Sequence, residues 1–439
     1  MLSRATRIAP LAALIAIPVL AAQVFEGKLL TDHPARAGLL AVAFVAIVVM
    51  LTKPGAILVM ALPATYLYYR VGPASTDISL ADVALAIALF AALPLVPWRA
   101  STMRSMLRVL GIYLLILAIP VVSVFSQRAA IEWGHRAFLV GGGILVGSAI
   151  AATGRTVTAL RTYLAASSVV AIAAIGDAMG HLARGAGLAP AYPFGIQKNA
   201  AGFLLVAALL TLVILPRIVD FSRPMTRRVA MGLLLLGVGA CQARGAALTL
   251  VVVTVLWAIQ EDRVRLSLPT LIGVLLLVVV TYFGVTAAFR SDQQSSQYNS
   301  VNSRISTYNA SLDLWRRDPL VGVGLKYWRN SNFAGELAFG EPHDLVVSAL
   351  GETGVIGLLA LGVLVLATIA VLRRGRSSVA TFAALIVVAK VVASSVDIFW
   401  VAGSFTLAWI VVGLACAADT SPEDLRTLSN AANRPSRVP

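Results

Sequence analysis

The chain has 439 residues, of which 59% are hydrophobic and only 13% are charged, and its mean hydropathy is +0.87. Soluble globular domains are about half apolar and a quarter charged, so this composition excludes an ordinary soluble fold. The formal net charge is +15, which would suggest nucleic acid as a partner of a soluble protein. In a membrane protein, basic loops mark the cytoplasmic face instead, and we expect no nucleic-acid partner.

Apolar runs of roughly 15–25 residues recur along the whole chain, which is typical of transmembrane helices. The sequence therefore predicts an all-α polytopic membrane protein with about 12–14 transmembrane helices and one large, partly helical external loop. In chain order, the runs are 8–24, 37–52, 55–69, 78–97, 107–126, 137–153, 158–177, 199–216, 229–242, 246–260, 267–288, 345–372, 378–394 and 398–417.

The basic loops set the orientation. The loops at 98–108, 217–228, 261–265 and 373–376 are rich in Lys and Arg, which places them in the cytoplasm. The loops at 127–136, 178–198, 243–245 and 289–344 then lie on the external face. The predicted organisation is N-terminal transmembrane helices with short loops over 1–288, the large loop over 289–344, C-terminal transmembrane helices over 345–417, and a polar cytoplasmic tail over 418–439, expected to be disordered.

The large loop is too long to be structureless, so we expect it to carry structure and function. Tyr308, Leu312 and Trp315 follow helical spacing on one face, and Pro319 with the glycines that follow ends that helix. Pro342 suits the first turn of the next apolar helix, which puts His343 near a helix N-terminus at the external interface.

Four cations lie within a residue or two of predicted external membrane boundaries, where positive charge is disfavoured. They are Arg136, Lys198, Arg244 and Arg290. One reading is that their side chains extend to lipid headgroups. Nearby acids are too few to pair all of them, however, and Arg suits phosphate oxygens well. The set therefore favours a site for the phosphate or pyrophosphate of a lipid carrier.

His343 has Glu341 and Asp344 beside it. A lone interfacial histidine is more often structural, but imidazole titrates near neutral pH and suits a general base acting on a hydroxyl. Either acid could orient the ring. Zinc-ligand spacing is missing and no clear carboxylate pair suits magnesium, so we expect no metal and no cofactor. Four loop residues could bind an acceptor, or could form only the loop's own small core: Arg304, Tyr308, Arg316 and Trp328.

Several segments together resemble the O-antigen ligase/polymerase superfamily over roughly residues 190–365. They are GIQKNAAGFLLVAAL, ARGAALTLVVV, RISTYNASLDLWRRDPLVGVGLKYW and PHDLVVSALGETGVIGLLALG, in chain order. The chain departs from the family pattern in having Ala243 where a serine is usual and Asp344 where an asparagine follows the histidine.

The resemblance implies a multi-pass glycosyltransferase of the bacterial inner membrane whose active site faces the periplasm. It would move O-antigen polysaccharide from undecaprenyl pyrophosphate to a sugar hydroxyl of lipid A–core, without metal and with inversion, in contact with membrane lipids. His343 would be the general base, and Arg244 and Lys198 match basic positions of the family. The alternatives are an O-antigen polymerase, a protein O-oligosaccharyltransferase or, in a different class, a lipid-linked glycan transporter that uses Asp82, Lys390 and Asp397.

Overall fold

A computed structural model describes residues 54–71, 78–185, 189–219, 224–260, 300–330, 342–375, 377–397, 400 and 403–417. These residues are overwhelmingly α-helical, and the only β pairing among them is one isolated bridge between Arg70 and Ser79. The predicted all-α membrane fold is confirmed. The predicted runs at 8–24, 37–52 and 267–288, and the tail at 418–439, lie outside the described residues.

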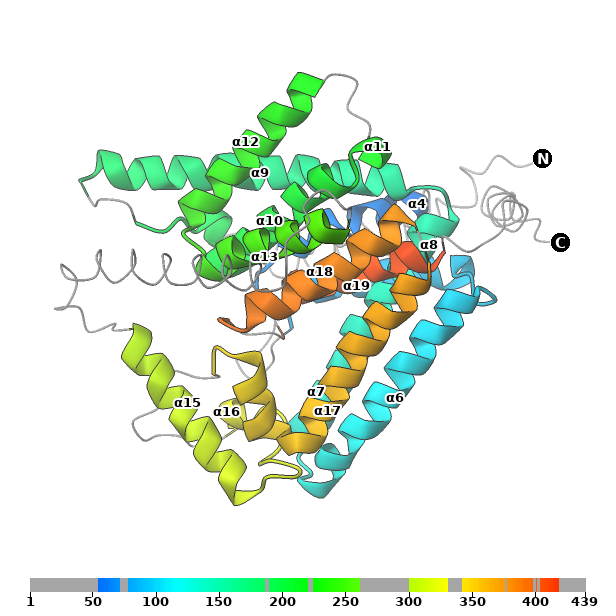
Figure 1. Cartoon of the computed structure of the whole chain (residues 1–439), viewed down its shortest axis with the longest axis vertical. Helices are drawn as coiled ribbons and strands as arrows, with labels where there is room; N and C mark the ends of the chain where they lie inside the picture. Colours follow the sequence, from blue (N-terminus) through cyan, green and yellow to red (C-terminus); the bar gives the residue numbers. More distant parts are fainter. Residues whose placement is uncertain are drawn as a thin grey trace, which may run out of the picture.

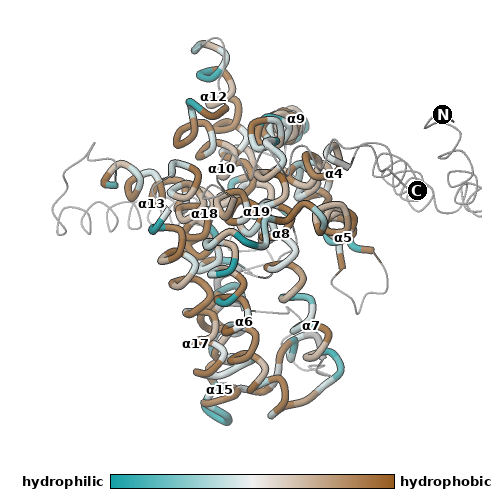
Figure 2. The backbone as a smooth tube through the Cα atoms, turned by 90° about the vertical axis from the view of Figure 1, so that its right-hand side faces the viewer, coloured by the Kyte–Doolittle hydropathy of each residue, from teal (hydrophilic) through white to brown (hydrophobic). Residues whose placement is uncertain are grey.

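Four helical stretches in the described part are long and apolar enough to cross a membrane. They are α6 (Ser101–Ser123), the stretch Gln127–Ala152, α9 (Thr156–Ala183) and α17 (Leu345–Arg374). The shorter apolar helices are α5 (Leu80–Ala92), α10 (Lys198–Ile214), α13 (Arg244–Gln260), α18 (Ser378–Ser394) and α19 (Ser404–Cys416). Between them lie α4 (Pro54–Met60), α11 (Pro216–Val219) and α12 (Pro224–Cys241). Figure 2 shows hydrophobic colour along most of α6 and α17.

Several predicted boundaries are wrong. Helices α6 and α12 begin six and five residues before the predicted spans, and α9 ends six residues after its span. The largest difference is at the span predicted over 137–153. Residues 127–136, expected as an external loop, form α7 (Gln127–Ala137), which continues through a π-helical turn (Phe138–Gly142) into α8 (Gly143–Ala152). The Ser126 hydroxyl caps the new helix start by accepting from the Ala129 amide. The charged residues of α7 lower its hydropathy, and the pattern therefore predicted a loop. In the structure Glu132 and Arg136 are buried and paired with each other.

The centre of the bundle is α19, in which every residue is buried. It crosses α8 closely because both helices present glycines there: a methyl group at Gly147 would collide with the Ile410 carbonyl, and one at Gly413 with the Ile144 carbonyl. Small residues of this kind let helix backbones approach within a membrane, where apolar burial alone provides little driving force. This crossing anchors the interior of the protein.

An extended arm projects from this bundle. In Figure 1, α6, α7 and α17 run side by side away from the bundle towards α15 (Ser300–Arg317) and the short α16 (Tyr327–Asn330) of the large loop. Helix α15 ends before Pro319 as predicted. Its fully buried stripe, however, is Thr307, Ser311 and Leu314, one position away from the predicted aromatic face. The small Ser311 lies against Gly351 of α17, so close contact between helices decides which face is buried.

Candidate active site

His343 lies just before α17 and is held at two points. The Tyr308 hydroxyl of α15 donates to the His343 carbonyl oxygen over 3.1 Å. The His343 Nδ1 atom lies 3.0 Å from Oδ1 of Asp397, in the turn that follows α18. An ionised carboxylate only accepts hydrogen bonds, so this contact places the ring proton on Nδ1. The lone pair is then on Nε2, the form that a general base requires.

Among the described residues, the carboxylate bonded to the imidazole belongs to Asp397 and not to the expected Asp344. Asp344 uses Oδ1 to accept from the Val347 amide over 2.8 Å, which caps the start of α17. Glu341 lies outside the described residues. The sequence did contain a signal for Asp397: α17 runs from His343 to the loop at 373–376 and α18 runs back from that loop, so the last residues of α18 return to the end at which His343 lies. Helix order, rather than nearness in sequence, identifies this partner.

The predicted cations Lys198 and Arg244 lie at the starts of two helices that meet. Gly202 of α10 packs directly on Ala243 and Ala246, so that the first turns of α10 and α13 lie together. A methyl group at Gly245 would lie 2.8 Å from Val396 Cγ2 and 3.1 Å from the Ala393 carbonyl oxygen. The start of α13 therefore abuts the turn that carries Asp397, which joins the segments of Arg244, Lys198 and His343.

This meeting point suits an anion. Helix N-termini carry unsatisfied N–H groups and partial positive charge. Lys198 is partly buried and Arg244 is exposed, and each is the first residue of its helix. Two helix starts with a cation at each, beside a histidine with a defined tautomer, form an arrangement that can hold a phosphate group next to a base.

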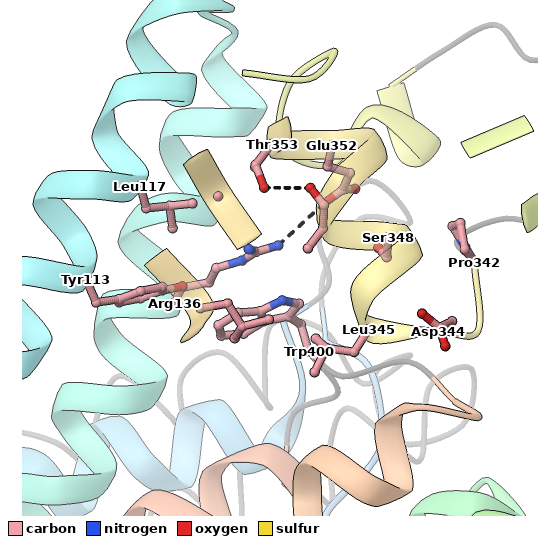
Figure 3. A pocket seen from close by; sticks show the side chains of 13 residues that line it. Tyr113, Leu117, Arg136, Pro342, Asp344, Leu345, Ser348, Glu352, Thr353 and Trp400 are labelled. Carbon is pink, nitrogen blue, oxygen red and sulfur yellow. Dashed lines mark hydrogen bonds and ion pairs between the residues drawn. The ribbon is translucent and has the colours of Figure 1, made fainter. Parts of the chain in front are cut away.

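Arg136 has a different environment from these two cations. Its Nε donates to Glu132 Oε1 over 2.9 Å, its Nη2 lies 3.5 Å from Glu352 Oε2, and its Cζ lies 4.0 Å from the centre of the Trp400 ring. Lys326 of the large loop lies 3.8 Å from Glu132 as well. Figure 3 shows the Arg136 side chain lying over Trp400 and pointing to Glu352. Glu132 and Glu352 offset the charge of Arg136, so the prediction that nearby acids are too few to pair the cations does not apply to this residue.

The remaining predicted residues are placed as follows. Arg290 lies outside the described residues, and so does the side chain of Arg304, although its backbone belongs to α15. Arg316 is largely exposed and pairs with Asp313 over 2.7 Å. Trp328 is buried, with its ring edge-on to Tyr327. The described geometry therefore brings Tyr308 to His343, and for Trp328 it shows packing against Tyr327.

Two of the sequence motifs interlock. Helix α17 breaks at Gly354, where φ is 62° and ψ is −164°. The Val355 amide donates to the Pro319 carbonyl over 2.9 Å, and the Gly324 amide donates to the Glu352 carbonyl over 2.8 Å. The DPLVGVG segment thus satisfies backbone groups that the break leaves without helical partners.

Glycine is required at this junction. A side chain at Gly322 would collide with the backbone of Glu352, and one at Gly354 would collide with the backbone of Leu320. Both also have positive φ, which other residues adopt only at a cost. The junction fixes the large loop to α17 at residues 351–356, which include Glu352 beside Arg136 and lie further along the helix than His343.

Comparison with known proteins identifies one segment. Residues 229–362 match the family model described as O-antigen ligase (Wzy_C). The match includes α12, α13, the described part of the large loop and the first turns of α17, and thus Arg244 and His343. No curated protein matches the chain.

Proposed function

Because residues 229–362 place the chain in the O-antigen ligase superfamily, we propose that it is a glycosyltransferase that moves O-antigen polysaccharide from undecaprenyl pyrophosphate to a sugar hydroxyl of lipid A–core. The reaction takes place at the periplasmic face of the bacterial inner membrane. The observation that carries the proposal is the imidazole of His343, bonded to Asp397 and adjacent to the starts of α10 and α13.

In this mechanism His343 is the general base. Its Nε2 accepts the proton of the acceptor hydroxyl while that oxygen forms a bond to the anomeric carbon of the donor sugar. The bond from this carbon to the pyrophosphate oxygen breaks, and its electron pair leaves with undecaprenyl pyrophosphate. Attack from the side opposite the leaving group inverts the anomeric configuration. The imidazolium, whose charge Asp397 offsets, then releases the proton to water.

The cations stabilise the leaving group. Negative charge grows on the pyrophosphate as the bond breaks, and positive groups already in place lower the energy of that state without reorganising. Lys198 and Arg244 are the described residues best placed for this role. Arg290 belongs to the proposed set on sequence grounds. Arg136 is its weakest member, because Glu132 and Glu352 already engage its guanidinium.

The same geometry serves a close relative of this reaction. In an O-antigen polymerase the attacking hydroxyl belongs to another carrier-linked repeat, and in a protein O-oligosaccharyltransferase it belongs to a protein. We favour lipid A–core as the acceptor because the predicted external face is strongly basic, which suits a phosphorylated acceptor. The transporter alternative loses one of its candidate residues, because Asp397 contacts the imidazole.

The deciding experiment is transfer by the purified protein in lipid nanodiscs. The donor is a glycan on undecaprenyl pyrophosphate, and the acceptor is lipid A–core. Glycan on lipid A–core supports the ligase, whereas longer carrier-linked glycan supports the polymerase. No covalent product from either acceptor, with glycan moved across the bilayer of proteoliposomes, would refute the enzyme and support the transporter.

A further inference from the structure

A small polar pocket lies beside His343, between α17, α6 and α7. Figure 3 shows its lining. Asp344, Ser348 and Glu352 line it at four-residue spacing along α17, and Arg136 lies across from them. Tyr113 and Thr353 also belong to the lining. Residues four apart lie on one face of a helix. This face therefore presents a polar stripe that begins next to the base.

The Ser348 hydroxyl is the group that indicates a ligand. Ser348 is only 9% exposed and lines the pocket, and its side chain makes no hydrogen bond with any other described residue. A hydroxyl without a protein partner that faces a cavity can bond a polar group that enters it. Asp344 likewise commits only Oδ1 to the helix cap. The pocket thus offers hydrogen-bonding groups that the protein itself does not satisfy.

The charge of the lining indicates which chemical class of ligand the pocket can bind. The lining holds one cation, Arg136, and two carboxylates, Asp344 and Glu352, so its formal charge is negative. A phosphate would be repelled here, whereas the starts of α10 and α13 favour it. A hydroxyl group both donates and accepts, which suits a serine hydroxyl and a carboxylate oxygen side by side.

The size of the pocket limits the chemical group that can enter it. The cavity measures about 20 Å³, room for a single water molecule or one hydroxyl. Its other walls are apolar and include Leu117, Leu345 and Trp400. A mostly apolar wall with a few placed polar groups is the usual make-up of a small-molecule site.

We propose that this pocket is the acceptor subsite, in which Ser348 and Asp344 bind a hydroxyl of the acceptor sugar other than the one that His343 deprotonates. This assignment rests on the proposed function and adds that the donor and the acceptor bind in two separate parts of the site. The donor pyrophosphate lies at the cationic helix starts, the acceptor sugar lies along α17, and the imidazole lies between them. Ser348 and Asp344 determine which acceptor sugar is used.

The test compares two acceptors in the transfer assay. The first is lipid A–core. The second is an analogue whose acceptor sugar lacks one hydroxyl beside the attacked position, and one such analogue is made for each of these hydroxyls. A site that bonds a substrate hydroxyl discriminates against the analogue that lacks it. For one analogue the native protein should show a roughly 10-fold lower kcat/KM. Ser348→Ala should raise the KM for the normal acceptor about 3- to 10-fold, leave the donor KM unchanged and lose discrimination against that analogue.

Two further measurements keep the outcome clear. Thr368→Val alters a buried hydroxyl on the same helix away from the pocket, and it should leave both KM values and the discrimination unchanged. Acceptor binding is also measured without turnover, in His343→Ala, where adding Ser348→Ala should weaken it by the same factor. Unchanged acceptor affinity, full discrimination by Ser348→Ala, or a change in the donor KM alone would overturn the subsite. Failure of the native protein to glycosylate lipid A–core would overturn the proposed function instead.

Discussion

Substitution of Asp397 by asparagine tests the proposed base most directly. Asparagine keeps the shape of the side chain but loses the charge, and its amide can present a donor to Nδ1. The imidazole then no longer needs to keep its proton on Nδ1, and the imidazolium formed during transfer has no counter-charge. The residue lies 3.0 Å from the ring, so the lost interaction is a direct one.

The expected loss follows from the kind of bond. A hydrogen bond to an ionised group contributes about 1.5–3 kcal/mol, and each 1.36 kcal/mol changes a rate about tenfold. The side chains of His343 and Asp397 are 27% and 15% exposed, so water screens part of the interaction. We therefore expect kcat to fall roughly 10- to 50-fold in Asp397→Asn, with little change in the KM of either substrate.

The assay is a double-mutant cycle with the transfer reaction as the readout. His343→Ala should lower kcat about 10²- to 10⁴-fold. If Asp397 acts through the imidazole, adding Asp397→Asn to His343→Ala should cause no further loss. Asp313→Asn is a matched control, because Asp313 is an exposed acid of the large loop whose partner among the described residues is Arg316. Independent, multiplicative losses in the double variant would refute the proposed role of Asp397.

Three further outcomes test other parts of the structure. Arg244→Gln should raise the KM for the pyrophosphate donor about 10-fold or more, because a charge-assisted bond to phosphate is lost. Arg104→Gln, in the first turn of α6 and in the loop predicted to be cytoplasmic, should change nothing, and an unaltered donor KM in Arg244→Gln would remove that residue from the site. Gly354→Ala should destabilise the protein by more than about 2 kcal/mol, because φ is 62° and the new methyl meets the backbone of Leu320. Its counterpart on the same helix, Gly362→Ala, has open space and should leave the melting temperature equal or slightly higher. Transfer should continue in excess EDTA, because the cations take the place of a metal, and a loss of activity that Mg²⁺ restores would contradict this expectation.

The helices were largely predictable because membrane insertion is governed by local composition. A run of apolar residues partitions into the bilayer whatever its neighbours do, so α18 was predicted with the correct ends and α10 to within two residues. The same reasoning located the reversal between α12 and α13 at 243–245. It failed at 127–136, because a polar stretch can be buried when its charged groups pair with each other. A hydropathy value carries no information about such pairing.

The site was predictable only in part, for a related reason. The cations stood out because their positions violate a one-dimensional rule about charge and membrane boundaries. The histidine stood out because two acids lie beside it in the sequence and it ends the largest loop. Which of them share a site depends on contacts between segments far apart in the sequence. The two interlocking motifs around Gly322 and Gly354 were visible as strings of letters, but their shared geometry was not.

By itself, the sequence determined that this chain is a multi-pass helical membrane protein with a histidine at a helix start and cations close to the ends of apolar runs, since each of these features depends on residues that are local along the chain. The tertiary structure alone decided that Asp397 contacts the imidazole of His343, that Glu132 and Glu352 engage Arg136, and that Ser348 lines a pocket beside His343. Those facts depend on which helices pack together, and packing is set by small residues at crossings such as Gly147, whose partners no local pattern specifies.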